Sequence, residues 1–312
     1  MAITASMVKE LREMTGAGMM DCKKALNETD GNMDEAVEFL RKNGQAKAEK
    51  KANRIAAEGL CAVVVSADSK TAAVVEVNSE TDFVAKNDTF KEFVTAVANQ
   101  AVETNAADLD AFMAESWKED TSKTVQEALV EKVAVIGENL KIRRFEKVTA
   151  ENGCVQSYVH GGGRIGVIVE AETSVVNDAV KEAMTNIAMQ IAALNPKYVC
   201  RAEVSAEYIA HEKEILLAQI KNDPKESQKP EKVINGMIEG RISKELKEIC
   251  LLDQVYVKAE DGKQTVGKYL EQVSKEVGSD VSVKRFVRFE TGEGLEKKNE
   301  DFAAEVAAQM NA

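Results

Sequence analysis

The sequence is poor in cysteine and histidine, and this limits the chemistry that it can carry out. The five cysteines lie too far apart for the spacing of a metal site or a redox motif; they are Cys22, Cys61, Cys154, Cys200 and Cys250. We expect reduced, mostly buried thiols. The histidines are His160 and His211, and no Gly-x-Ser-x-Gly motif occurs. A nucleophilic active site therefore has little support, no acid/base pair of carboxylates stands out, and no cofactor or metal is expected.

The sequence also lacks a long hydrophobic run and an excess of basic residues. No stretch approaches the ~20 apolar residues of a membrane helix. The first residues, MAITASMVKELREM, lack the apolar run of a signal peptide. We therefore expect a cytoplasmic protein without membrane contact. The net charge of −12 and the pI of about 5.0 argue against nucleic-acid binding driven by general electrostatics, but leave room for a local basic patch.

The chain is long and apolar enough for a sizeable core. Its 312 residues are 44% hydrophobic, and at roughly 100–200 residues per domain we expect two or three domains. Residues 4–43 predict three short helices, with Gly44 just after the third. Residues 45–58 are charged and predict a helical or flexible linker, so the first domain with its linker is placed at residues 1–56. A short amphipathic helix is expected in residues 292–312.

From Gly59 onward the sequence repeats itself. Two pairs of apolar, β-type runs around a turn occupy residues 59–77 and 153–172. Each pair is followed by a helix that begins Asn-Asp, at Asn87 and at Asn177, and Asn is a good N-cap. The sequence therefore predicts the same hairpin and helix twice.

Each repeat is completed by a third strand in which basic residues alternate. These strands are expected at residues 139–148 and 280–290. The fold class is therefore α+β, with a core of two repeated units of hairpin, helix and strand. The first unit is placed at residues 57–150, and the second at residues 151–202 and 249–291.

The two units differ in what is inserted before the third strand. The first has residues 104–138, which are largely helical in pattern, and the second has the longer residues 195–280. Pro224 and Pro230 bracket a polar turn between two stretches of helical spacing. We expect an antiparallel helical hairpin at residues 203–248. Such a projection buries little against a globular core, so it is a candidate interaction arm.

One connection, within SETDFVAKND at residues 79–88, carries an unexpected aromatic residue, Phe83. Connections between strand and helix lie on the surface and should be polar. When the Glu-Thr pairs at 80–81 and 172–173 are aligned, five residues (DFVAK) lead to the helix in the first unit and three (SVV) in the second. The fold therefore does not require the Asp-Phe pair. Phe83 either packs back on its own unit or anchors a partner, as aromatic hot-spot residues do.

A glycine motif, GGGRIG at residues 161–166, matches the Gly-x-Gly-x-x-Gly of dinucleotide-binding sites. That fingerprint must end a strand and open a helix. Here the glycines are followed by VIVEAE, which predicts another strand, so we interpret them as a hairpin turn. No direct nucleotide binding is expected.

Two longer motifs, LREMTGAGMMDCKKAL and ETDFVAKN, occur in this order in the chain. Together with YVHGGGRIGV and VIGENLKIRRF, they make the sequence closely resemble the bacterial elongation factor Ts family over nearly its whole length. The resemblance implies a guanine nucleotide exchange factor, not an enzyme, whose partner is elongation factor Tu in its GDP-bound and nucleotide-free states. It also implies a ubiquitin-associated (UBA)-like N-terminal domain, a two-subdomain core and a coiled-coil insertion.

The resemblance also implies roles for particular residues. The segment associated with displacement of Mg²⁺ from elongation factor Tu falls on Thr81, Asp82, Phe83 and Val84. Contacts with the GTPase domain of the partner fall on Met19 and Met20, another core contact on Ile136 and Gly137, and a contact with its third domain on His160. The C-terminal helix would pack on the GTPase domain.

A second hypothesis is an RNA-binding or translation-associated scaffold without exchange activity. Its support is the basic strand LKIRRFEK and the helical arm. Release of a fluorescent GDP analogue from elongation factor Tu would separate the two hypotheses. The sequence leaves open whether two copies of the chain pair through the core or the coiled coil.

Overall fold

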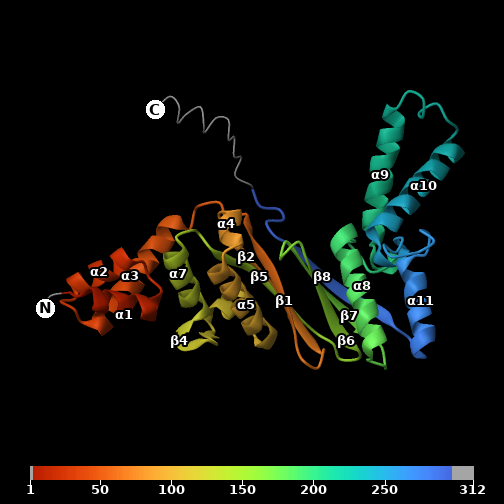
Figure 1. Cartoon of the computed structure of the whole chain (residues 1–312). Coiled ribbons are helices and arrows are strands. Elements are labelled where there is room, and N and C mark those ends of the chain that lie inside the picture. Colours follow the sequence, from red (N-terminus) through yellow and green to blue (C-terminus); the bar gives the residue numbers. More distant parts are fainter. Residues whose placement is uncertain (1–2, 297–312) are drawn as a thin grey trace.

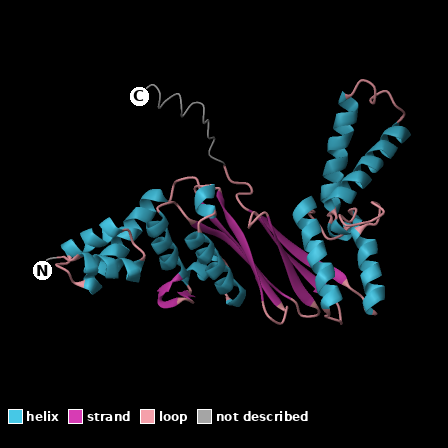
Figure 2. Cartoon of the chain, in the orientation of Figure 1, coloured by secondary structure: helices cyan, strands magenta, loops and turns pink. Residues whose placement is uncertain are grey.

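The computed structural model describes residues 3–296 of the chain (Figure 1). It confirms the α+β class: helices surround small antiparallel sheets. Figure 2 shows two sheets next to each other in the middle of the molecule, with helices on the outer side of each and at both ends. The C-terminal helix expected in residues 292–312 falls mainly on residues 297–312, which lie outside the described residues.

Three helices form the N-terminal part of the structure: α1 (Ala5–Thr15), α2 (Met19–Glu28) and α3 (Met33–Lys51). The hydroxyl of Thr4 caps α1 and the side chain of Asn32 caps α3, by accepting hydrogen bonds from the first turn of each helix. These helices enclose a small core of Val8, Leu11, Cys22, Ala25, Leu26 and Ala36.

The prediction that the third helix ends before Gly44 is wrong, because α3 continues to Lys51. Gly44 is buried where α3 packs against α7 (Val125–Ile136). A Cβ atom at Gly44 would lie 3.4 Å from the Cβ of Ala134. The glycine therefore permits a close helix–helix contact, and this contact outweighs the tendency of glycine to end a helix.

Each predicted unit has a three-stranded antiparallel sheet with its hairpin and third strand where the sequence placed them. The first sheet has the order β1-β2-β5, with β1 Glu58–Val65, β2 Thr71–Ser79 and β5 Lys141–Thr149. The second has the order β6-β7-β8, with β6 Cys154–His160, β7 Ile165–Glu172 and β8 Ser282–Glu290. Asn87 caps α5 (Asp88–Glu103) and Asn177 caps α8 (Asp178–Leu194), as predicted.

The two sheets pack face to face, so the core has four layers in the order helix, sheet, sheet, helix (Figure 1). Side chains alternate along the central strands. Val74 and Ile168 face the opposite sheet, whereas Val75 faces the α5 side and Val169 the α8 side.

The pairing of each central strand with the third strand has the same irregularity. The register shifts after a buried glutamate, Glu76 in β2 and Glu170 in β7, and the extra residue of the bulge lies in the third strand, at Arg143 in β5 and at Lys284 in β8. Next to each bulge, a glycine with positive φ lies against the backbone of the central strand: Gly59 in β1 and Gly153 just before β6. A Cβ atom would lie 2.2 Å from a carbonyl oxygen at Gly59 and 2.1 Å at Gly153, so only glycine fits at these two positions.

These shared features correct the alignment of the two connections. With Glu76 matched to Glu170, Ser79 and not Thr81 corresponds to Thr173. The aligned Glu-Thr pairs were therefore displaced by two residues. The first connection has seven residues, 80–86, where the second has three, 174–176. The additional residues form the single-turn helix α4 (Asp82–Ala85).

The insertion of the first unit contains α6 (Leu109–Ala114), a small hairpin of β3 (Ser116–Trp117) and β4 (Asp120–Thr124), and α7. This hairpin was not predicted. Trp117 on β3 is buried against Phe93 of α5, with ring centroids 5.8 Å apart, which fixes the insertion on the core.

The insertion of the second unit contains the projecting pair α9 (Ala206–Asn222) and α10 (Glu231–Ile249) (Figure 1). These two helices have their own apolar cluster, which includes Ile220, Ile242 and Leu246. Two short 3-10 helices, η1 (Arg201–Glu203) and η2 (Leu251–Asp253), flank the pair, and α11 (Val266–Val277) packs against α8. No helix within residues 3–296 is long and apolar enough to cross a membrane.

Candidate partner-binding site

The candidate site is α4, which presents one aromatic ring to solvent. Phe83 is 80% exposed, the highest value among the exposed large apolar side chains of residues 3–296. Ala85 on the same turn is buried, and Val84 is half-buried against the core of the first unit. Phe83 therefore does not pack back on its own unit. The inner side of α4 attaches the turn to the core while the ring stays free.

Thr81 fixes the start of this turn. Its hydroxyl accepts a hydrogen bond of 3.3 Å from the Val84 N–H group, as an N-cap does. Its own backbone carbonyl accepts a hydrogen bond of 3.0 Å from the Ser79 hydroxyl, at the end of β2. The turn is thus bonded to the strand that precedes it.

One carboxylate, that of Glu138, holds the connection from the other side. It accepts hydrogen bonds from the Glu80 N–H group at 3.0 Å, from the Thr81 N–H group at 3.1 Å and from the Thr81 hydroxyl at 2.7 Å. In return, the Glu80 carboxylate accepts one of 2.6 Å from the Asn139 N–H group. Hydrogen bonds to an ionised acceptor are stronger than neutral ones, so the base of α4 is firmly positioned.

The end of α7 directs Glu138 toward this connection. Gly137 closes the helix with φ of 87°, a left-handed conformation that favours glycine. Its carbonyl also accepts a hydrogen bond from the Lys51 ammonium group at the end of α3. Ile136 and Gly137, which the sequence assigned to a separate contact, therefore lie beside the segment that begins at Thr81. Burial lowers the pKa of Lys51, and the nearby Arg54 adds to this effect.

Asp82 places a negative charge beside the exposed ring. Its carboxylate accepts a hydrogen bond of 2.6 Å from the Lys86 ammonium group, one helical turn further on. This hydrogen bond from Lys86 lowers the pKa of the Asp82 carboxyl group. Asp82 is exposed and ionised at neutral pH, and it is available to a partner if Lys86 swings away.

The other predicted residues lie apart from α4. Met19 and Met20 begin α2 and are 58% and 75% exposed. His160 ends β6 and is exposed, with its Nδ1 atom 3.1 Å from the Tyr158 hydroxyl. The structure thus brings Thr81, Ile136 and Gly137 together and leaves the two methionines and His160 as separate surface points.

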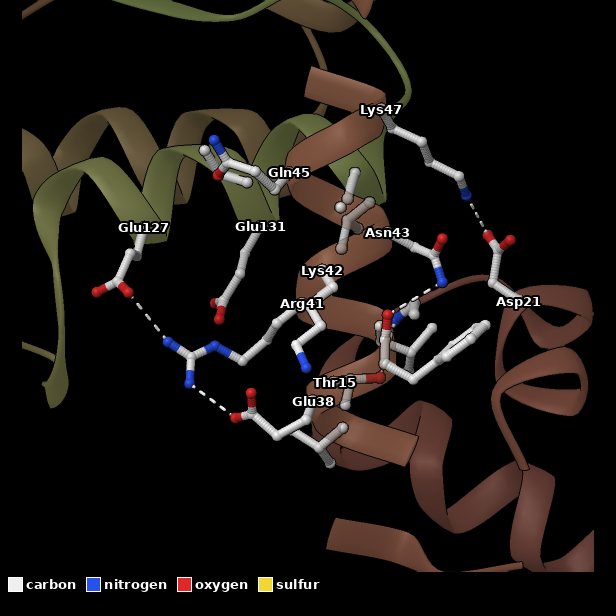
Figure 3. A pocket seen from close by; sticks show the side chains of 18 of the residues that line it. Thr15, Asp21, Glu38, Arg41, Lys42, Asn43, Gln45, Lys47, Glu127 and Glu131 are labelled. Carbon is white, nitrogen blue, oxygen red and sulfur yellow. Dashed lines mark hydrogen bonds and ion pairs between the residues drawn. The ribbon is translucent and has the colours of Figure 1, made fainter. Parts of the chain in front are cut away.

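The N-terminal helices are bound to the first unit around a pocket of about 520 Å³ (Figure 3). Arg41 on α3 donates hydrogen bonds of 3.1 Å to Glu38 on its own helix and to Glu127 on α7. Lys47 on α3 donates one of 2.9 Å to Asp21 on α2. Exposed ion pairs contribute little to stability individually. Together with the contact at Gly44, they set the position of α2, and hence of its methionines, relative to α7.

Comparison with known proteins identifies the family. The model of the family described as "Elongation factor TS" matches residues 80–293. The chain is 54% identical over 308 residues to "Elongation factor Ts" of Clostridioides difficile (strain 630), and 52% over 309 residues to that of Clostridium novyi (strain NT). It is 50% identical over 308 residues to "Elongation factor Ts" of Clostridium tetani (strain Massachusetts / E88), and each comparison covers 99% of both chains.

The chain belongs to the elongation factor Ts family. The resemblance that the sequence motifs suggested is therefore confirmed. Thr81–Val84, Ile136, Gly137 and His160 lie within the range that the family model matches, and the two methionines of α2 precede it.

Sequence reasoning missed the residues that position α4. Glu138 and Thr81 are 57 positions apart, and the carboxylate follows a helix-ending glycine with no spacing that links it to the connection. Asn139 was missed for the same reason; its side chain donates hydrogen bonds to the carbonyl groups of Ala52 and Arg54 after α3. Among residues 3–296, no three or more His, Cys, Asp or Glu side chains are grouped so that they could hold a metal ion.

Proposed function

We propose that this chain is a translation elongation factor that binds elongation factor Tu in its GDP-bound state, displaces Mg²⁺ and promotes GDP release so that GTP can enter. Membership of the elongation factor Ts family supports the partner. The observation that carries the mechanism is the exposed Phe83 ring on a short helix whose base is held by Glu138.

The thermodynamic basis of exchange is linkage. An exchange factor lowers the affinity of its partner for nucleotide only by binding the nucleotide-free partner more tightly than the loaded one, by the same factor. It need not touch GDP itself, and we propose no direct nucleotide binding and no catalysed covalent step. Surface complementary to the empty state of the partner is sufficient.

Phe83 supplies such a surface. Insertion of its ring into an apolar gap of the partner is worth roughly 1.5–3 kcal/mol through burial. The ring is already held outward in the free chain, so little conformational freedom is lost on insertion. Asp82, at the edge of the same turn, would pair with groups of the partner that otherwise support the Mg²⁺ shell. Because a bound Mg²⁺ is a large local charge, its loss weakens phosphate binding strongly.

The remaining family positions would enlarge the contact. We propose that Thr81 and Val84 support the inserted turn, and that Met19, Met20, Ile136, Gly137 and His160 contact the partner around it. The UBA-like character of residues 1–56, the domain boundaries, the coiled-coil nature of the arm and the cytoplasmic location remain predictions of the same proposal. A homodimer through the core or the arm also stays a prediction.

The basic strand that favoured an RNA-binding scaffold is largely engaged within the protein. Arg143 and Arg144 on β5 both bind the buried Glu76 carboxylate, at 2.9 and 2.6 Å. The guanidinium group of Arg144 also lies over the ring of Phe289 on β8, 4.2 Å from the ring centroid. These guanidinium groups hold the two sheets together, so they are poorly placed to displace counterions from RNA.

The proposal is tested by release of a fluorescent GDP analogue from elongation factor Tu. Catalytic amounts of this chain should accelerate release, and excess Mg²⁺ should slow the accelerated reaction. RNA binding without any acceleration would support the scaffold instead.

A further inference from the structure

A groove lies on the first unit where the described chain ends, apart from α4 and from the pocket of Figure 3. It encloses about 880 Å³ between α3, α6, α7 and the start of β5. The half-buried Leu109 and Met113 form part of its apolar wall, next to Leu129 and Val133, which are largely buried in the core of the first unit. Ile55, 42% exposed, and Leu295, 37% exposed, complete this wall. Two of the large apolar side chains that the described residues leave exposed thus lie in one place.

The groove has the form that suits a helix. α7 lines it with Gln126, Leu129, Val130 and Val133, which share one helical face. α3 lines it with Gln45, Ala48 and Glu49, and its C-cap residue Ala52 continues the same spacing. The face on α7 is roughly 10 Å long at 1.5 Å per residue. The small side chains of Ala48 and Ala52 leave space for the backbone of an additional helix.

The chain itself provides an occupant of suitable length. Leu295 and Glu296, the last described residues, line the groove, and residues 297–312 follow them. The sequence of this tail predicts an amphipathic helix with Phe302, Val306 and Met310 on one face. That apolar stripe is roughly 12 Å long, which matches the face on α7. Residues 297–301 can span up to about 17 Å, so the stripe is within reach.

We propose that, in the free chain, residues 297–312 dock into this groove as a helix, with the apolar stripe against α7 and α3. The groove rim carries charges of both signs, with Arg54 and Lys141 against Glu49 and Asp110, so apolar contact and not net charge favours the tail. Docking would also cover Arg54, whose exposed guanidinium group pairs with Glu80 at the base of α4. The inference concerns the free chain alone, so it stands or falls separately from the proposed exchange activity.

The test is paramagnetic relaxation in the full-length chain. Cys200, the one cysteine that is not buried, is replaced by Ser, and Ala308→Cys on the polar face of the tail carries a nitroxide. In a ¹⁵N-labelled sample, amide signals along Gln126–Val133 and in α6 should broaden relative to the reduced, diamagnetic label. Signals of α9 and α10 should not change. Absent broadening at α7, or broadening centred on another surface, would overturn the proposal.

Matched tail variants show whether the apolar stripe is responsible. Phe302→Asp with Val306→Asp should restore the α7 signals, whereas Ala304→Asp, about 200° around the helix from Phe302, should leave them broadened. All of these changes lie in the tail. A melting temperature close to that of the parent chain would show that the core of each variant is folded.

A mixture of ¹⁵N chain without nitroxide and unlabelled chain with nitroxide separates intramolecular from intermolecular docking. The α7 signals should stay sharp in this mixture. Broadening there would mean that a second copy fills the groove, and it would contradict the proposal for the free chain.

Discussion

In the second unit of the core, three residues (174–176) separate Thr173 from Asn177, the cap of α8. In the first unit, seven residues (80–86) separate the equivalent Ser79 from Asn87, the cap of α5. Both helices begin at an asparagine cap and cover the same face of equivalent sheets. The short connection shows that the fold needs neither α4 nor an aromatic side chain here. The additional helix α4, with its exposed aromatic ring, is therefore available for binding a partner.

The anchors of the two connections differ as well. In the second unit, the hydroxyl of Ser174 pairs with that of Ser279 before β8, at 2.8 Å. In the first, the place before β5 is taken by Glu138, which accepts three hydrogen bonds. A neutral pair is sufficient to close a short connection. The longer connection, which carries an exposed ring, has the stronger, charged anchor.

The buried glutamates of the two central strands occupy equivalent positions in the two units, so their ion pairs can be compared directly. Glu76 accepts hydrogen bonds from Arg143, Arg144 and Asn78, and from the Gly292 N–H group at 2.8 Å. Glu170 pairs with Lys284 at 3.0 Å and Arg285 at 2.8 Å. Side-chain exposure is 24% and 31% for the two partners in the first unit, against 45% and 46% in the second. The first pairing is therefore the more enclosed one.

The largest expected effect is on stability, from loss of the charge at Glu76. Glu76→Gln should lower the free energy of unfolding by about 3–5 kcal/mol, because two enclosed guanidinium groups lose the buried counter-charge that they share. Arg144 then keeps only the exposed Glu293 carboxylate, at 3.3 Å. Glu170→Gln should cost less, since its half-exposed partners can turn toward water. Urea unfolding of both variants measures the difference. Equal losses would show that the two pairings are energetically alike.

The same comparison has a pH dependence. Burial alone would raise the pKa of the Glu76 carboxyl group, but hydrogen bonds from the Gly292 N–H, Asn78 and the two arginines lower it overall. A carboxyl group whose folded-state pKa is lowered contributes stability above its unfolded pKa, about 4.3 for Glu. That contribution is lost as the pH falls through the folded value. Unfolding measured down the acidic range should therefore show a shallower decline in Glu76→Gln than in the parent chain.

The second prediction concerns the connections themselves. Phe83→Ala should slow GDP release from elongation factor Tu by about ten- to a hundredfold, the equivalent of the 1.5–3 kcal/mol lost with a buried ring. The melting temperature should barely change, since the ring is exposed. Val176→Ala, at the exposed apolar residue of the sister connection, is the matched control and should leave release unchanged. A destabilised Phe83→Ala chain whose folded fraction exchanges nucleotide normally would contradict the proposed insertion of the ring.

The third prediction distinguishes the contribution of the Phe83 ring from that of Glu138, which holds the base of α4. Glu138→Ala removes the acceptor of three hydrogen bonds and should cost about 1–2 kcal/mol of stability. It should also slow GDP release although Phe83 is intact, because the turn is no longer held in place. Ser279→Ala, at the corresponding position of the second unit, should lower stability less and slow GDP release less. Unchanged release by Glu138→Ala would show that the ring acts without preorganisation.

The repeated units explain which features could be predicted from the sequence. Apolar β-type runs, turn residues and Asn-Asp caps are local signals, and they placed both hairpins, both helices and both third strands. Phe83 was also predictable, since its residue type conflicts with a polar connection. Gly44 misled the prediction because α7, far along the chain, decides its environment. Glu138 was missed for the same reason, as its hydrogen bonds join segments whose proximity exists only after folding.

The smallest expected effect is at the hairpin turns. His160 ends β6 in the second unit, where the first unit has Ser66 after β1, and His160 is exposed. We expect His160→Ala to weaken association with elongation factor Tu by up to about tenfold, the loss of one peripheral contact of about 1 kcal/mol. Ser66→Ala should leave association with elongation factor Tu unchanged, although it removes the hydrogen bonds of the Ser66 hydroxyl with Asp68 and with the Thr71 N–H group.

The maximal rate distinguishes a binding role of His160 from a mechanistic one. A residue that only adds affinity raises the concentration of factor needed, so release by His160→Ala should reach the parental maximum when the factor saturates elongation factor Tu. A residue that distorts the nucleotide site would lower that maximum at any concentration. His160 belongs to a turn whose Gly163 carbonyl accepts a hydrogen bond from the Cys61 N–H group, which ties it to β1 of the first unit. Titration of both turn variants to saturation is therefore the measurement, and a lowered plateau for His160→Ala would contradict a purely binding role.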